Sequence, residues 1–237
     1  MRATRRSDTI FVFGSGASLN ELSPRELEEF EEHDTLGFNW FVRQRFLRCD
    51  YHVVREITDD DLDPRVWRPA VEEYFRLVRE SPFFAATVFV VQSGFRAING
   101  NRAIALKLLP PGARVFRFRS LVGRWDLSPS LGQGLAHRHA TLEECVNFAY
   151  LLGWNRIVLV GVDLYDRRYF WLGPDETRET DRRRGASASD AHRTATTGLI
   201  EQMGDWGLRM QTSNVALEVY NPRSLLADVL PVYRRRV

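Results

Sequence analysis

One histidine stands at the end of the most polar stretch of the sequence. His192 closes the segment GPDETRETDRRRGASASDAH, which covers residues 173–192. Because imidazole titrates near neutral pH, His192 is a candidate general base, or else an exposed histidine with no catalytic role. His137 and His139 form an H-x-H pair that could bind a metal. The sequence offers no evident third ligand, so solvated or capping roles fit this pair as well.

Two tyrosines follow the most apolar run of the chain. The sequence GVDLYDRRYFW places Asp163, Tyr165 and Tyr169 directly after this run. Phenol groups beside Arg167 or Arg168 could stabilise the negative charge that develops on a departing phosphate. In the alternative interpretation, the aromatic rings close the core beneath the charged segment.

A glycine-rich turn near the start of the chain could contact a phosphate. In FVFGSGASL, Gly14 and Gly16 would let backbone N–H groups approach the phosphate, while Ser15 and Ser18 supply hydroxyl donors. The turn lacks the third glycine of a dinucleotide motif and the lysine of a P-loop, so it could also be a simple strand-to-helix connection. Asn39, in GFNWF, could bind a nucleotide or cap the following helix.

Alternating strands and helices are needed to bring these residues together. Apolar runs predict strands at residues 9–14, 35–41, 50–56, 86–92, 113–119, 156–164 and 215–221. Helical patterns predict helices at residues 23–33, 64–80, 101–109, 140–154, 192–203 and 222–230. This alternation predicts a single Rossmann-like domain over residues 1–237: an α/β fold with a doubly wound, mostly parallel sheet.

The expected sheet brings the polar residues to one edge. Its most apolar strand, residues 156–164, should be central, and the half-polar strand at residues 113–119 should lie at an edge. Residues 173–192 cannot contribute to a core, so they are expected to form a long lid loop after the central strand. In open α/β sheets this carboxyl side is where ligands bind.

The composition excludes several classes of protein. The 237 residues carry a net charge of only +2, which gives no general case for nucleic-acid binding. Cys49 and Cys145 are too few for a disulfide scaffold or a zinc site, and fit a reduced, cytoplasmic setting. No apolar run is long enough to span a membrane. The basic end PVYRRRV allows at most peripheral contact with the inner membrane face, and a homo-oligomer is open.

In this order, the motifs resemble the bacterial sialyltransferases of glycosyltransferase family 42 and the wider group of domains of unknown function 115. That group includes flagellin glycosyltransferases and an archaeal pterin diphosphokinase. The family's G-x-G-P-S-L turn is matched by GSGASL, and its helix-to-strand motif by YLLGWNRIVLVGVDLY. Asn39, His192 and the closing sequence NPRSLLADVLP match further positions, so that the resemblance covers most of the chain.

The resemblance implies an inverting transfer of a nonulosonic acid from a CMP-activated donor to a glycan acceptor, without a metal or other cofactor. It implies that His192 is the general base and that Tyr165 and Tyr169 stabilise the leaving CMP phosphate. The implied nucleotide contacts are Gly14, Ser15, Gly16, Ser18, Asn39, Thr141, Gly161 and Asp163. The family has Asn and Pro where this chain has Ser15 and Ala17.

Two other functions remain open. A diphosphokinase on the same scaffold would need Mg²⁺, for which Asp163, Asp166 and Asp175 are candidate ligands. A nucleotide-binding module without catalysis would use the same turn. In the glycosyltransferase interpretation, the acidic sugar could meet an arginine of the run at residues 182–184, which is otherwise a solvated stretch of charge.

Overall fold

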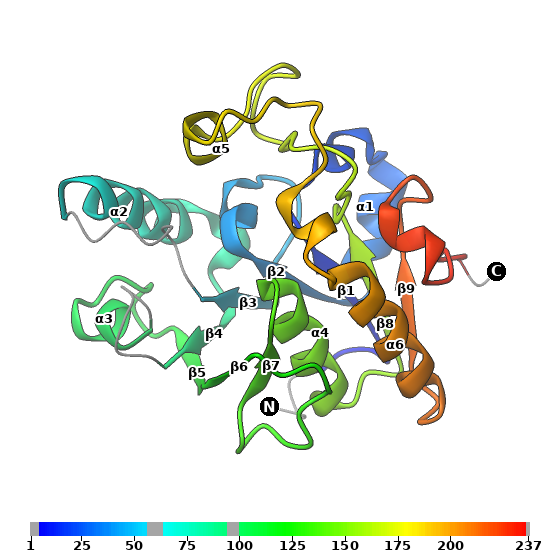
Figure 1. Cartoon of the computed structure of the whole chain (residues 1–237). Coiled ribbons are helices and arrows are strands. Elements are labelled where there is room, and N and C mark those ends of the chain that lie inside the picture. The colour runs from blue at the N-terminus through cyan, green and yellow to red at the C-terminus, as the bar shows by residue number, and fades with distance from the viewer. Residues whose placement is uncertain (1–4, 56–63, 94–99, 236–237) are drawn as a thin grey trace.

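The fold is a seven-stranded parallel sheet with helices on both faces (Figure 1). The computed structural model describes residues 5–55, 64–93 and 100–235. The strands are β1 (Thr9–Phe13), β2 (Asp34–Phe38), β3 (Tyr51–Val54), β4 (Val88–Gln92), β5 (Arg114–Phe118), β8 (Arg156–Val160) and β9 (Ala216–Val219). Their order in the sheet is β5-β4-β3-β2-β1-β8-β9. The predicted doubly wound α/β fold is confirmed, with β5 at an edge.

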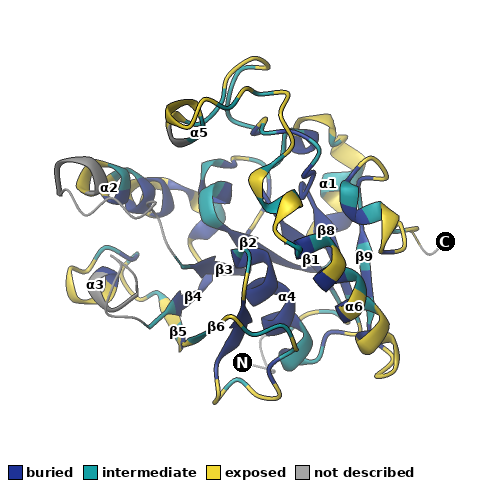
Figure 2. Ribbon diagram, in the orientation of Figure 1, coloured by how far each residue is buried: buried dark blue, intermediate teal, exposed yellow. Residues whose placement is uncertain are grey.

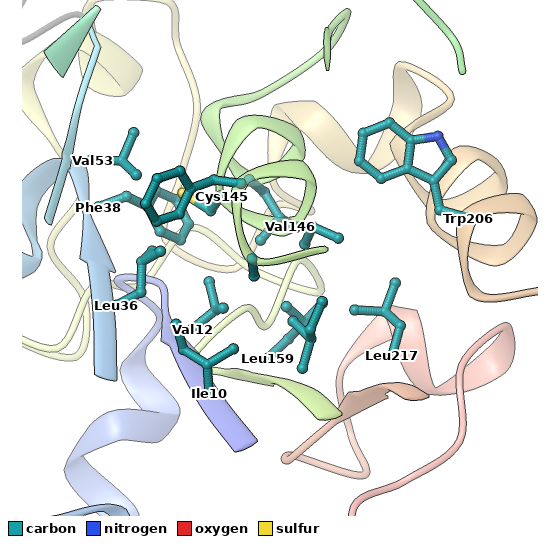
Figure 3. Packing of buried hydrophobic residues seen from close by; sticks show 14 of the residues in the cluster. Ile10, Val12, Leu36, Phe38, Val53, Cys145, Val146, Leu159, Trp206 and Leu217 are labelled. Atoms are coloured by element: carbon teal, nitrogen blue, oxygen red, sulfur yellow. The ribbon is translucent and has the colours of Figure 1, made fainter. Parts of the chain in front are cut away.

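Alternate residues of each inner strand pack against opposite layers of helices. The helices are α1 (Pro24–Glu31), α2 (Pro64–Glu80), α3 (Gly100–Ala105), α4 (Thr141–Leu152), α5 (Glu179–Arg183) and α6 (Leu199–Gln211). In β1, Ile10 and Val12 belong to the core beneath α4 and α6, as Figure 3 shows, whereas Phe11 and Phe13 belong to the core on the other face. The sheet is therefore buried on both faces (Figure 2).

Two predicted helix ends are confirmed in detail. Ser23 caps α1, and its side chain and that of Glu26 form the expected capping box, with Pro24 in the first turn. Gly153 ends α4 in the left-handed conformation, at φ 87°. Among the described residues, no helix is both long and apolar enough to cross a membrane.

Several predicted elements differ from the structure. Strand β8 is interior, but it lies between β1 and β9, one position from the edge, and not at the centre. The predicted helix at residues 192–203 is split: a 3-10 turn, Arg193–Thr196, comes first, and α6 begins only after Gly198, whose φ of 96° interrupts the helical path. The long charged segment is not free of secondary structure, because it contains α5.

The end of the chain also differs from its prediction. Residues 222–230 form only the 3-10 turn Leu225–Asp228, which Ser224 caps through its side chain. Pro231 further disfavours a helical conformation at Leu230. The chain then runs along β9, where the Val219 N–H donates to the Pro231 carbonyl (3.0 Å) and the Tyr233 N–H to the Val219 carbonyl (2.8 Å). Sequence analysis also missed β6 (Ser120–Val122) and β7 (Leu135–His137), which pair in parallel. Three residues are too few for a periodic pattern.

Candidate active site at the carboxyl edge of the sheet

The order in which the strands are added to the sheet reverses between β1 and β8. From β1 the strand order proceeds through β2 to β5 on one side, and from β8 to β9 on the other. Loops that leave two such strands diverge, which opens a crevice at their carboxyl ends. A pocket of about 280 Å³ lies there. It is lined by most of the predicted residues, namely Gly14, Ser15, Gly16, Asn39, Thr141, Gly161, Asp163, Tyr169 and His192.

The glycine turn after β1 is bound tightly to β8. The Gly14 N–H donates to the Val160 carbonyl and the Gly16 N–H to the Gly161 carbonyl, both at 2.8 Å. A Cβ on Gly14 would lie 2.5 Å from the Gly161 oxygen, and one on Gly16 would overlap the Asp163 carboxylate. The glycines are thus required by this close approach, and their amides are not directed at a ligand. Of the turn's predicted donors, Ser15 remains at the pocket.

Asp163 and Ser18 complete the connection between the turn and β8. The buried Asp163 carboxylate accepts hydrogen bonds from the Ser18 N–H (3.0 Å), the Ser18 hydroxyl (2.6 Å) and the Asn221 amide (3.0 Å). Because these bonds occupy both carboxylate oxygens, Asp163 fixes the geometry of the pocket floor. Asn221, the first residue of the sequence NPRS, was not identified as a functional residue from the sequence.

Asn39 has an unusual backbone conformation at the pocket. It directly follows β2 and adopts φ 52°, a left-handed conformation that asparagine tolerates better than most residues. Among the described residues its side chain has no hydrogen-bond partner, and it lines the pocket. A strained residue with an uncommitted amide is typical of a ligand contact.

His192 is held by contacts with three residues, Leu164, Thr194 and Tyr169. The backbone N–H of His192 donates to the backbone carbonyl of Leu164 at 3.0 Å. Leu164 itself has a left-handed conformation, with φ 63°. The His192 Nδ1 lies 2.7 Å from the Thr194 hydroxyl and 3.3 Å from the Thr194 N–H, while its Nε2 lies 3.4 Å from the hydroxyl of Tyr169. Burial lowers the pKa of His192 below its usual value, which keeps the imidazole neutral at neutral pH. Thr194 was not identified from the sequence.

Tyr169 forms the roof of the pocket next to His192. Its side chain is buried, and burial raises its pKa, so the phenol keeps its proton. The ring packs against Trp171, with 4.8 Å between centroids, and the Arg178 guanidinium lies 5.7 Å from the ring centre. The Arg43 guanidinium lies 5.7 Å from the ring centre of Trp171 and 4.9 Å from that of Trp40. Arg43 therefore connects the segment of Tyr169 and Trp171 to the residues that follow β2.

Three arginines and two aspartates, Asp163 and Asp166, line the pocket. Arg55, Arg168 and Arg178 all line it. Arg55 lies 3.4 Å from the buried Glu144, and Arg168 pairs with Asp166. Arg55 follows β3, whereas Arg168 and Arg178 belong to the segment after β8. Neither Arg55 nor Arg178 was identified from the sequence. Such a lining suits an anionic ligand.

The N-terminus of α4 forms another wall. Its first residue, Thr141, lines the pocket, and the preceding Ala140 has no side-chain oxygen with which to cap the helix. The Glu143 carboxylate instead accepts the N–H groups of Arg138 (3.0 Å), His139 (2.7 Å) and Ala140 (2.8 Å). Because Glu143 and Glu144 lie in the first turn, their carboxylates offset much of the partial positive charge of this helix end.

The H-x-H pair belongs to this wall. Both His137 and His139 line the pocket, and burial lowers the pKa of His137 to about 4. The His139 ring meets the edge of Trp125 at 6.2 Å. Among the residues that the structure describes, no group of three or more His, Cys, Asp or Glu side chains could hold a metal ion. The pair therefore forms part of the pocket wall.

The proposed magnesium ligands do not converge. The oxygens of Asp163 are bound to Ser18 and Asn221, and Asp166 is paired with Arg168. Asp175 is exposed and does not line the main pocket. This donor set does not fit a magnesium ion.

Two further predicted contacts lie outside the main pocket. Tyr165 lines a neighbouring pocket, which also contains Asp166, Arg168 and Asp175. The run of arginines at residues 182–184 is exposed at the charged segment, where Arg182 and Arg183 pair with Glu179. An acidic sugar in the main pocket would therefore meet other arginines.

The fold and site define an α/β protein with a cationic pocket at the switch point of its sheet. No known protein family and no curated protein matches the sequence. Among solved structures, the chain is similar to the monofunctional α-2,3-sialyltransferase Cst-I from Campylobacter jejuni, with 14% identity and a TM-score of 0.48 over 95% of this chain and 80% of that one.

Two further structures are similar at the same level. The sialyltransferase CstII from Campylobacter jejuni, in complex with the substrate analogue CMP-3FNeuAc, shares 13% identity with a TM-score of 0.43 over 94% of this chain and 85% of that one. The MAf glycosyltransferase from Magnetospirillum magneticum AMB-1 shares 13% identity with a TM-score of 0.45, over 92% of this chain and 32% of that one.

Proposed function

We propose that the protein is an inverting glycosyltransferase that moves a nonulosonic acid from a CMP-activated donor to a glycan acceptor. The observation that supports this most is a neutral imidazole, His192, beside the buried phenol of Tyr169 in a cation-lined pocket. A base for the acceptor hydroxyl and a donor for the leaving phosphate are the two groups that a single displacement at a sugar carbon requires.

The donor carries negative charge on both its phosphate and its sugar carboxylate. Arg55 and Arg178, which both line the pocket, are the proposed cationic contacts, and Thr141 at the start of α4 is a further polar contact. Ser15 and Asn39 are the proposed contacts from the turn after β1 and the exit of β2. The nucleotide would then lie against the floor of the pocket, which is formed by Gly14, Gly16, Ser18, Gly161 and Asp163.

The transfer step follows from the positions of His192 and Tyr169. The acceptor hydroxyl gives its proton to His192 Nε2 as its oxygen forms a bond to the anomeric carbon. The bond between that carbon and the phosphate oxygen breaks on the opposite face, and its electron pair stays with CMP. Tyr169 and Arg178 would donate to the phosphate as its charge increases, for which the Tyr169 hydroxyl would have to turn away from His192 Nε2, 3.4 Å from it in the structure. Attack opposite the leaving group inverts the anomeric centre.

This step requires a particular tautomer of His192. Nε2 carries a lone pair only when the proton of the neutral ring is on Nδ1, where the Thr194 hydroxyl can accept it at 2.7 Å. In this tautomer the Thr194 N–H, which donates to Nδ1 at 3.3 Å in the structure, would have to give up that bond. Because side chains would carry the charge of the phosphate, no metal takes part in the proposal. Tyr165 was predicted to stabilise the leaving phosphate. For that role its hydroxyl would have to reach into the main pocket past the ion pair of Asp166 and Arg168, which lies between the main pocket and the neighbouring one.

The first experiment is a thermal-shift panel on the full chain. We expect CMP at 100 times its Kd to stabilise the protein by about 2.7 kcal/mol without Mg²⁺, and ATP to have little effect. A shift with ATP and Mg²⁺ alone would favour the diphosphokinase. A shift with CMP but no turnover of any CMP-sugar would favour a binding module.

The second experiment tests the general base. His192→Ala should lower the rate of transfer by about 10²- to 10⁴-fold, the usual contribution of such a group, and leave CMP binding intact. The matched control is His33→Ala, since His33 lies near the amino ends of the strands at the turn before β2. Equal rates for wild type and His192→Ala would refute the assignment.

A further inference from the structure

Positive charge is concentrated in one part of the sequence. Residues 81–125 contain seven arginines and lysines and no aspartate or glutamate, although the whole chain has 31 acidic residues. Because the net charge of the whole chain is +2, the remainder carries −5. The stretch includes β4, α3 and β5, which lie together at one side of the sheet (Figure 1). This side of the molecule therefore has cations without carboxylates of its own to neutralise them.

Strand β5 carries part of this charge along the edge of the sheet. Arg114 in β5 and Arg119 just after it are exposed, and neither forms an ion pair with another described residue. The Arg114 guanidinium donates to the carbonyl of Ala86 (2.6 Å), a neutral group. Since alternate residues of a strand point to opposite faces, Arg114 lies on the face of Phe116, toward α4, and Arg117 lies on the other. The edge thus has cations on both faces.

The outer side of β5 has backbone groups that the sheet does not use. The Ser93 N–H donates to the Phe118 carbonyl (2.6 Å), so Phe118 and, by alternation, Phe116 and Arg114 turn their backbone groups toward β4. Val115 therefore turns its N–H and C=O outward, and neither bonds to a described residue outside the sheet. An edge of this kind is a template for another strand.

A groove lies beside this edge. Its volume is about 310 Å³, and its lining includes the apolar side chains of Phe116 and Leu131 together with Gly132 and Arg119. The Leu135 N–H donates to the Arg119 carbonyl (2.8 Å), so the returning chain pairs with the outer side just after β5 ends. A strand laid along β5 would have room for one apolar side chain in the groove. No residue of the groove lines the main pocket.

We propose that the β5 edge binds an extended, acidic segment of another protein, which adds to the sheet as a further strand. Backbone hydrogen bonds to β5 would give affinity, and the groove would select an apolar side chain at one position. Acidic side chains on the two faces of the added strand would meet the arginines on both faces of the edge. A flat anionic membrane would meet the arginines of one face only, and a second copy of β5 would bring like charges together.

The first test measures peptide binding to the full chain by fluorescence anisotropy. The probe is a labelled peptide of about eight residues in which glutamate and valine alternate. We expect it to bind, and to bind more weakly as salt is added. The same peptide with alternate backbone nitrogens methylated keeps its charge but cannot pair as a strand, so it should bind at least about tenfold more weakly. A peptide of alternating lysine and valine should not bind. Equal binding of the methylated peptide would overturn strand addition.

The second test changes the edge itself. Val115→Pro removes the outward N–H and leaves the bonds to β4, since proline is tolerated on an edge strand where its nitrogen faces solvent. Val115→Thr is the matched control, because it keeps the N–H. We expect the proline variant to bind the glutamate–valine peptide about tenfold more weakly and the threonine variant to bind like wild type. Melting curves report whether both fold. Unchanged binding in a folded Val115→Pro would refute the proposal, and the methylated peptide decides if that variant does not fold.

The third test concerns charge and the nature of the partner. Arg114→Gln and Arg119→Gln should each weaken peptide binding by about two- to twelvefold, and Arg25→Gln, exposed on α1, should not. Equal losses in all three would contradict a role for the edge. Tighter binding to phosphatidylglycerol vesicles than to the peptide would assign the surface to a membrane and overturn the proposal. Turnover of CMP-sugars should be the same in these variants, so the peptide assay stands apart from the proposed activity.

Discussion

Replacing Thr194 with valine removes a hydroxyl and keeps the backbone. The Thr194 hydroxyl lies 2.7 Å from His192 Nδ1, and the Thr194 N–H, at 3.3 Å, stays in the variant. With only an N–H donor facing Nδ1, the ring should place its proton on Nε2, which is the wrong tautomer for a base. A net hydrogen bond of about 0.5–1.5 kcal/mol corresponds to a fall in kcat of roughly two- to twelvefold.

The pH profile adds a readout that a purely structural role would not change. Protonation of His192 removes its lone pair, so activity is lost as pH falls through its pKa. Burial already lowers that pKa below the ordinary histidine value. In Thr194→Val the imidazolium loses an acceptor at Nδ1, so the acidic limb of kcat should move to still lower pH.

The assay is kcat against pH for CMP-sugar turnover, with nitrogen NMR to determine the tautomer of His192 in the full chain. Thr194→Ser should restore both the pH profile and the tautomer of the wild type. Thr196→Val is the control, because the Thr196 hydroxyl donates to a carbonyl in the same turn (3.1 Å) and not to His192. A proton on Nε2 in the wild type, or an unchanged pH profile in Thr194→Val, would refute the reasoning.

Two further predictions concern the floor and the roof of the pocket. Gly16→Ala would place a methyl group against the Asp163 carboxylate. The melting temperature should therefore fall, by an amount that corresponds to a loss of about 1–3 kcal/mol in the free energy of unfolding. The control is Gly132→Ala, whose Cβ would have its nearest neighbour at 4.0 Å and which should leave the melting temperature unchanged. Equal melting curves would contradict this. Arg178→Gln should reduce CMP-sugar turnover by on the order of tenfold to a hundredfold, and Arg184→Gln should not; similar losses in both would argue against a role for Arg178.

The sequence predicted the sheet well because its strands are strongly apolar. All seven predicted strands form, and because parallel carboxyl ends meet at one edge, Asn39, Tyr169 and His192 line one pocket, as expected. The position of β8 within the sheet could not be predicted, because both its faces are buried wherever it lies among the inner strands.

The direction of individual groups could not be predicted. A glycine turn that faces a phosphate and one that is bound to the next strand have the same residue types. Only the register of β1 with β8 decides that the amides of Gly14 and Gly16 are used inside the protein. Arg55 and Arg178 were missed for a related reason, since nothing in their own segments indicates that they lie across one pocket.

The C-terminal segment that runs along β9 has a consequence for association between copies of this chain. Exposed strand edges invite pairing with another chain, and the segment at Pro231–Tyr233 covers the outer edge of β9. At the opposite edge, β5 exposes Arg114 and Arg117. Two molecules that met through β5 would bring like charges together. The sheet is thus protected against edge-to-edge aggregation by covering at one side and by charge repulsion at the other.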